Sequence, residues 1–187
     1  MPVQGFFDEH SKRDKEEARG NAEDFTYYFI LGWLQSKQEN VKSNPSKRPL
    51  YHATTIENFR KIVYEGLLPK NRSYDWEDWN EYLFLSNIKA VPIWFRWSYS
   101  NRGMENVYKI PTIILRTYEY KKCKEDYHGT RDSGYPAFMC LETIKPEYLE
   151  VWNGEIWKPI EDLTPGEIDD LEEDFMYNYN NFVERFL

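Results

Sequence analysis

The segment from Pro49 to Pro69, PLYHATTIENFRKIVYEGLLP, decides the fold predicted for this chain. It begins as a strand, turns at two threonines and continues as an amphipathic helix with Ile56, Phe59, Ile62 and Val63 on one face. Thr54 and Glu57 are spaced as a capping box, so we expect Thr54 to be the N-cap of the helix. Gly66 can adopt the left-handed conformation that ends a helix, and Pro69 prevents the helix from resuming. The segment therefore predicts a strand–helix unit.

His52 lies in this strand, shortly before the helix. Because side chains alternate along a strand, Leu50, His52 and Thr54 share one face, and Tyr51 and Ala53 share the other. Two interpretations of the histidine are open. It is either a half-buried side chain bonded to neighbouring backbone, or part of a binding site.

Further segments follow in an order that resembles a known fold. YHAT at 51–54 and EGLLP at 65–69 precede YLFLS at 82–86 and FMCLETIKPEYL at 138–149. Over residues 49–158 this order is similar to the ADP-ribosyltransferase fold, as in the DNA-modifying ADP-ribosyltransferases of toxin systems and the NAD-dependent RNA 2′-phosphotransferases. The resemblance implies an α+β domain: two small, roughly crossed sheets, antiparallel or mixed, with flanking helices.

The resemblance also implies an activity, the transfer of ADP-ribose from NAD to a macromolecular acceptor, either protein or nucleic acid. In this family, the histidine at the position of His52 bonds a ribose hydroxyl, and an adjacent backbone group holds the nicotinamide amide. The residues expected to contact NAD are Tyr51, His52, Ala53, Thr54, Arg72, Tyr82, Phe84 and Ser86. The loop at 70–81 is expected either to cover this site or to plug the side of the core.

The resemblance fails at one position, because Ala137 stands where the DNA-modifying branch has a catalytic glutamate. Alanine can neither accept a hydrogen bond nor act as a base. Either Glu142 or Asp132 supplies the carboxylate, or the chain resembles the phosphotransferase branch, which relies on arginines such as Arg72, Arg96 and Arg102. In the third explanation the nucleotide pocket remains without transfer activity. The protein would then be a nucleotide-binding or protein-interaction domain, or an acidic inhibitor or decoy of nucleic acid.

Length and composition indicate one folded domain. The 187 residues divide into an N-terminal arm, apolar helix and linker at 1–48, a core at 49–160 and an acidic helix at 161–187. Hydrophobic residues make up 41% and aromatic residues 18% of the chain, which is typical of folded proteins. No apolar run reaches the roughly 18 residues of a membrane span, and the N-terminus lacks the apolar core of a signal peptide, so we expect a cytoplasmic protein without membrane contact.

Charge and cysteine content restrict the chemistry. The net charge of −8 opposes broad, nonspecific binding to phosphate backbones, although a small basic cleft remains compatible with it. Cys123 and Cys140 show none of the spacings of zinc ligands. We expect both to be free thiols and expect no metal site.

Other elements follow from local patterns. We expect a buried helix at 25–35, a helix after Asn87, strands at 107–118 and 135–143, and a charged loop at 119–134. A hairpin is expected at 148–159, turning at Asn153 and Gly154. Thr164, Pro165 and Glu167 predict a helix start, and one face of that helix should dock through Phe175, Tyr177, Tyr179, Phe182 and Phe186.

Overall fold

The computed structural model describes residues 29–30, 32–33, 48–69, 82–91 and 111–186, and they form an α+β domain. Seven strands make one antiparallel sheet, in the order β4 (Cys123–Glu125), β5 (Ala137–Cys140), β2 (Leu83–Ser86), β1 (Leu50–Thr54), β3 (Ile113–Thr117), β6 (Glu150–Trp152) and β7 (Trp157–Pro159). The helices are α4 (Ile56–Glu65), α6 (Tyr127–Ser133) and α7 (Pro165–Phe186), with 3-10 turns η4 (Pro146–Tyr148) and η5 (Ile160–Asp162). None of the described helices is long and apolar enough to cross a membrane.

The predicted strand–helix unit is confirmed, with two corrections at the ends of α4. Thr55, not Thr54, is the N-cap: its side chain accepts a hydrogen bond from the Asn58 amide at 3.3 Å, while Thr54 ends β1. Gly66 ends the helix with φ 78 and ψ −173, which is not the left-handed cap that we expected. The chain leaves α4 extended because Leu67 pairs with Ile144 in an isolated bridge.

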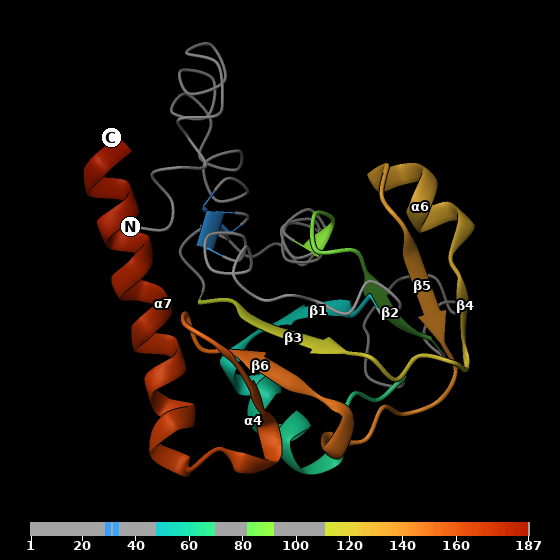
Figure 1. Ribbon diagram of the computed structural model, residues 1–187, viewed down its shortest axis with the longest axis horizontal. Helices are drawn as coiled ribbons and strands as arrows, with labels where there is room; N and C mark the ends of the chain where they lie inside the picture. The colour runs from blue at the N-terminus through green and yellow to red at the C-terminus, as the bar shows by residue number, and fades with distance from the viewer. Residues whose placement is uncertain (1–28, 31, 34–47, 70–81, 92–110, 187) are drawn as a thin grey trace.

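The sheet consists of two halves joined at a single residue pair. β4, β5 and β2 form one half, and β1, β3, β6 and β7 form the other. The register between β1 and β2 contains only Tyr51 opposite Ser86. Figure 1 shows β4 and β5 running across the direction of β1 and β3. The prediction of two crossed sheets is therefore corrected to one sheet with crossed halves, and every strand pair in it is antiparallel.

Alternating strand residues build a separate apolar cluster on each face of the sheet. The first cluster includes Leu50, Leu83, Leu85, Ile113, Leu115 and Val151, packed against Phe59 and Ile62 of α4. The second includes Tyr51, Ile114 and Trp152, packed against Phe29, Ile30, Trp33, Phe175, Tyr179 and Phe182. α7 joins both clusters, since its Ile168 and Leu171 belong to the first. Figure 1 shows α4 on one side of the sheet and α7 beside its end.

The prediction for the two ends of the chain is partly confirmed. Residues 29, 30, 32 and 33 are helical and buried, as expected for this stretch. α7 begins at the predicted start, with a capping box in which the Glu167 amide donates to Thr164 Oγ1 at 3.2 Å and the Thr164 amide donates to Glu167 Oε2 at 3.3 Å. Tyr177 does not dock, because 69% of it is exposed.

The expected charged loop at 119–134 is wrong, since it contains β4 and α6. Between β6 and β7 the turn spans four residues, in which the Asn153 side chain accepts from the Glu155 and Ile156 amides at 2.9 Å. The predicted loop at 70–81 and most of the helix after Asn87 lie outside the described residues.

The prediction of free thiols is also wrong. Cys123 of β4 and Cys140 of β5 lie directly opposite each other in the register and form a disulfide. The local sequence does not predict this pairing, because Cys123–Glu125 lacks the apolar alternation that is typical of a strand. The register of two neighbouring strands brings these cysteines together.

Candidate functional site

His52 lies at the junction of β1 and β2, the place where the two halves of the sheet separate. Its Nδ1 is 3.0 Å from the carbonyl oxygen of Phe84 in β2, which lies 32 residues later in the chain. The β1–β2 register ends at the pair of Tyr51 and Ser86. The imidazole therefore bonds a main-chain carbonyl at the place where the ladder between these strands stops, and it ties the two halves together.

This contact determines which ring nitrogen carries the proton. A carbonyl oxygen can only accept a hydrogen bond, so Nδ1 of His52 is the donor. In the neutral ring Nε2 then holds the lone pair and acts as an acceptor. The first interpretation from sequence, a half-buried histidine bonded to neighbouring backbone, is confirmed. A polar nitrogen held in a defined orientation is equally what a hydroxyl-binding site requires.

Most of the predicted NAD contacts on β1 and at the end of β2 are buried. Tyr51 is 7% exposed, and both it and Ala53 pack with the second apolar cluster. Thr54 and Ser86 are each 5% exposed. The strand alternation places Tyr51 and Ala53 on the face opposite that of His52. These residues form the interior of the junction, and the half-buried His52 lies at its edge.

The remaining predicted contacts, Phe84 in β2 and Tyr82 just before it, are half-buried. The rings of Tyr82 and Phe84 are 6.4 Å apart, and the Lys124 ammonium lies 5.3 Å from the centre of the Tyr82 ring. Aromatic faces of this kind can stack against a ligand ring or hold a cation. The predicted contact Arg72 lies outside the described residues, as do Arg96 and Arg102.

Ala137, the position of the missing glutamate, is enclosed. It pairs with Ser86, which in turn pairs with Tyr51, so these three side chains share one face near the junction. Only 3% of Ala137 is exposed, because α6 packs against it. A Cβ built on Gly129 of α6 would lie 3.1 Å from the Ala137 Cβ and would overlap the carboxyl group of Asp126.

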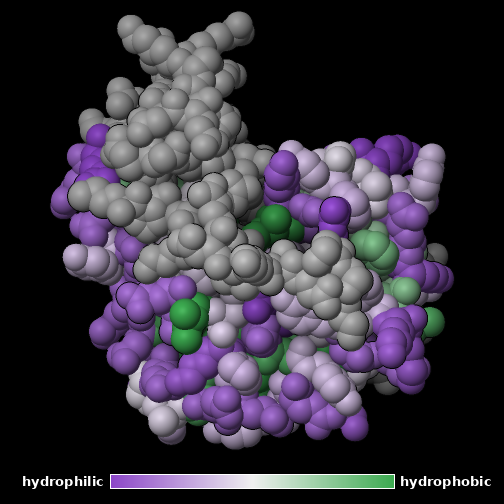
Figure 2. Space-filling model, viewed as in Figure 1, coloured by the Kyte–Doolittle hydropathy of each residue, from purple (hydrophilic) through white to green (hydrophobic). Residues whose placement is uncertain are grey.

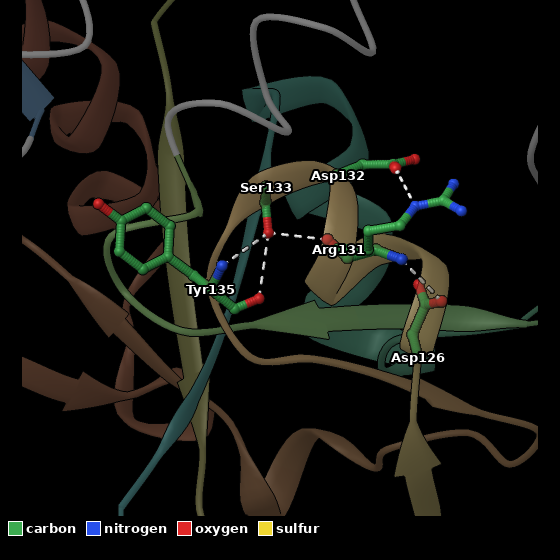
Figure 3. Close-up of polar contacts among 6 residues, drawn as sticks. Asp126, Arg131, Asp132, Ser133 and Tyr135 are labelled. Carbon is green, nitrogen blue, oxygen red and sulfur yellow. Dashed lines mark hydrogen bonds and ion pairs between the residues drawn. The ribbon is translucent and has the colours of Figure 1, made fainter.

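A buried carboxylate, that of Asp126, nevertheless lies close to Ala137. Asp126 is 3% exposed and is the N-cap of α6, where its Oδ1 accepts from the Gly129 amide at 3.0 Å (Figure 3). Its own amide donates to the Ala137 carbonyl at 2.8 Å. The spacing of an aspartate and a glycine three residues apart could have indicated a capped turn here, but not its contact with β5.

The two carboxylates proposed from sequence lie at the surface, each paired with a basic side chain. The Glu142 side chain is 58% exposed and accepts from the Lys122 ammonium at 2.6 Å. This hydrogen bond, together with the charge of Glu142, raises the pKa of Lys122. The Asp132 side chain is also 58% exposed and pairs with Arg131 at 3.0 Å. Each is a solvated ion pair, so neither supplies the missing glutamate.

A half-buried ion pair between Arg116 and Glu150 lies on the same face as Tyr51, and no local sequence pattern predicts it. The register aligns Tyr51, Arg116 and Glu150 across three strands. Arg116 Nε donates to Glu150 Oε2 at 2.5 Å, and its guanidinium carbon lies 4.6 Å from the centre of the Trp157 ring. This pair links β3 to β6, in the half of the sheet formed by β1, β3, β6 and β7.

The described surface offers no broad binding face in the view of Figure 2. Most of its residues there are hydrophilic, and the hydrophobic ones show as separate spots. Among the described residues no group of three or more histidines, cysteines or carboxylates could hold a metal ion. The junction at His52 is therefore the strongest candidate site.

No family model matches this sequence, and no curated protein or solved structure matches it either.

Proposed function

We propose that this chain is an ADP-ribosyltransferase-like domain that binds NAD, or its ADP-ribose part, at the junction of β1 and β2. The observation that carries the proposal is the hydrogen bond between His52 Nδ1 and the Phe84 carbonyl. It connects the two segments, YHAT and YLFLS, that the family resemblance assigns to opposite sides of a nucleotide site.

The expected chemistry is cleavage of the bond between nicotinamide and ribose. Its electron pair leaves with the nicotinamide nitrogen, and positive charge develops on the ribose in an oxocarbenium-like transition state. The ribose carbon then takes an electron pair from an acceptor oxygen or nitrogen, whose proton is released. Here His52 would orient the ribose through a hydroxyl.

The carboxylate that stabilises this charge in the DNA-modifying branch is missing at Ala137. Glu142 and Asp132 do not replace it, since both are paired at the surface. This favours a second candidate, a domain that binds the nucleotide and transfers ADP-ribose slowly or not at all. Loss of one such electrostatic contact commonly lowers a rate by about a hundredfold to a thousandfold. We therefore expect binding to be easier to detect than turnover.

The test combines binding with turnover. The folded protein is titrated with millimolar NAD, ADP-ribose and nicotinamide, and binding is followed by saturation-transfer NMR and thermal shift. NAD consumption and mass changes are then measured with protein, DNA and RNA acceptors. Binding with slow turnover supports the impaired candidate, and efficient modification of an acceptor supports the transferase. A protein that responds to none of the three ligands would refute the proposal.

A further inference from the structure

β4 and α6 form an arm, residues 123–136, at the edge of the sheet. β4 is the outermost strand in the sheet order, and it pairs with β5 through three register pairs. α6 follows directly and packs on β5, with Gly129 seated against Ala137. Figure 1 shows α6 beside the start of β5, away from α4 and α7. The arm therefore depends on β5 for its attachment.

The disulfide between Cys123 and Cys140 fastens this arm. The two residues face each other in the register, with Cα atoms 4.2 Å apart. Because the strand register itself places the two sulfurs together, the bond can form again whenever β4 pairs with β5. Cys140 is 1% exposed, whereas Cys123 is half-buried. Cys123 is thus the more exposed residue of the pair, and we take its Sγ as the sulfur that a thiol from solvent attacks.

Within the described part of the chain other contacts also hold the arm: the Asn87 amide donates to the Pro136 carbonyl at 2.9 Å, and the Lys124 ammonium lies 5.3 Å from the centre of the Tyr82 ring. The Lys122–Glu142 pair beside the disulfide has side chains 72% and 58% exposed, and such surface pairs contribute little to stability. At the far end the Asp126 amide donates to the Ala137 carbonyl, and the Ala137 amide donates to Thr130 Oγ1 at 3.0 Å.

Several polar bonds of α6 are internal to the arm. The Ser133 hydroxyl bonds the Gly129 and Tyr135 carbonyls, at 2.8 and 3.1 Å (Figure 3). These bonds close α6 on itself without tying it to the rest of the sheet. A helix of seven residues is too short to be stable alone, so it depends on β5 and on the fastening of β4.

We propose that Cys123–Cys140 is a reversible redox site, at which a dithiol reductant releases the arm and uncovers Ala137 beside the junction. A thiolate of the reductant attacks Cys123 Sγ, the disulfide breaks, and the Cys140 thiolate leaves and takes up a proton. The second thiol of the reductant then attacks the mixed disulfide. This step returns Cys123 as a thiol and leaves the reductant as a disulfide, so two electrons and two protons pass to the protein. The proposal does not depend on NAD binding.

Hydrogen exchange of the full chain, followed by mass spectrometry, tests this proposal. The oxidised protein is compared with the same protein reduced by dithiothreitol, and intact mass confirms the gain of two hydrogens. We expect amides at 123–136 to exchange about 100-fold faster after reduction, the effect of opening a loop of about 15 residues. Amides of α4, β1 and β3 should keep their protection, and removal of the reductant should restore the arm.

A matched variant gives the control. The double variant Cys123→Ser, Cys140→Ser should behave as the reduced protein does and should not respond to dithiothreitol. Equal exchange of the arm in both redox states would overturn the proposal, because the disulfide would then not fasten it. Equal acceleration over the whole chain would overturn it too, since that result indicates global unfolding. An intact mass showing two free thiols in the protein without reductant would also overturn the proposal.

Discussion

Gly66 passes so close to the carbonyl oxygen of Ile144 that a Cβ on Gly66 would overlap it. The contact accompanies a two-way bridge, in which the Leu67 amide donates to the Ile144 carbonyl at 2.9 Å and the Ile144 amide donates to the Leu67 carbonyl at 3.0 Å. It fastens the end of α4 to the segment that follows β5. The glycine is therefore required twice, for its positive φ and for the close approach of two backbones.

The first prediction is that Gly66→Ala destabilises the fold strongly. The side chain would meet backbone, which cannot rotate away, and alanine would be strained at φ 78. Strain of this kind and overpacking each cost about 1–3 kcal/mol, so we expect the free energy of unfolding to fall by about 3 kcal/mol. Urea titration monitored by circular dichroism measures this change. Gly166→Ala is the control, because a Cβ at Gly166 meets nothing within 4 Å.

The sequence predicts that the helix ends at Gly66, but it does not predict the contact between Gly66 and Ile144. A glycine after an amphipathic helix indicates a helix end, but nothing near Gly66 indicates Ile144, which is 78 residues away. The same reason explains the errors at 119–134. β4 has three residues, Cys-Lys-Glu, and no apolar alternation, so only its pairing with β5 makes it a strand. The disulfide followed from that register and was therefore missed as well.

For the candidate site, too, the sequence predicts the local features and not the contacts between distant segments. The alternation in β1 correctly placed His52 with Leu50 and apart from Tyr51, because that pattern is local. The partner of His52 is a main-chain carbonyl, which any residue carries, so no sequence pattern could identify it. The short register between β1 and β2 that exposes this carbonyl is likewise a property of the assembled sheet.

The second prediction concerns Ala137→Glu, which should destabilise the protein without restoring a catalytic carboxylate. Ala137 is 3% exposed and lies against α6, so the new charge would be buried next to Asp126. A buried charge without a partner costs about 3–5 kcal/mol, and a like charge adds to this. Thermal unfolding should show a clearly lower midpoint, with no gain in NAD turnover.

Glu142→Gln is the matched control for that substitution. It removes a carboxylate from an exposed pair, so the free energy of unfolding should change by less than about 1 kcal/mol. NAD turnover, where it is detectable, should stay the same. A folded Ala137→Glu protein with faster turnover would show that α6 does not enclose this position as described.

The third prediction is a pH dependence at the start of α7. The hydrogen bond from Lys158 and then the bond from the Thr164 amide lower the pKa of Glu167. A lowered pKa in the folded state means that the stabilisation is present above the usual glutamate pKa of about 4.3 and is lost as the pH falls through the folded value. Glu167→Gln should therefore lower the unfolding midpoint at pH 6, and the difference from the native protein should shrink toward pH 3.

Glu184→Gln, at an exposed position of the same helix, controls for the loss of a negative charge as such. Unfolding is followed by circular dichroism at both pH values in the same salt concentration. A constant difference between Glu167→Gln and the native protein across this range would contradict the assignment, because it would mean that the carboxylate charge does not contribute.

The fourth prediction tests the junction itself through His52→Ala. If His52 orients a ribose hydroxyl, its removal should weaken NAD binding by about 1–3 kcal/mol, the usual effect of deleting one partner of a buried hydrogen bond. The same change leaves the Phe84 carbonyl without its donor, so the unfolding midpoint should also fall slightly. Isothermal titration well below that midpoint separates the two effects.

His128→Ala is the matched control, because His128 is an exposed histidine of α6 and lies on the arm rather than at the junction. NAD binding should be unchanged in this variant. His52→Asn adds a second test, since an amide can donate to the Phe84 carbonyl while differing from imidazole in reach. It should recover part of the stability but little of the affinity. Equal affinity for NAD in the native protein and in a folded His52→Ala variant would show that the histidine serves only to join β1 to β2.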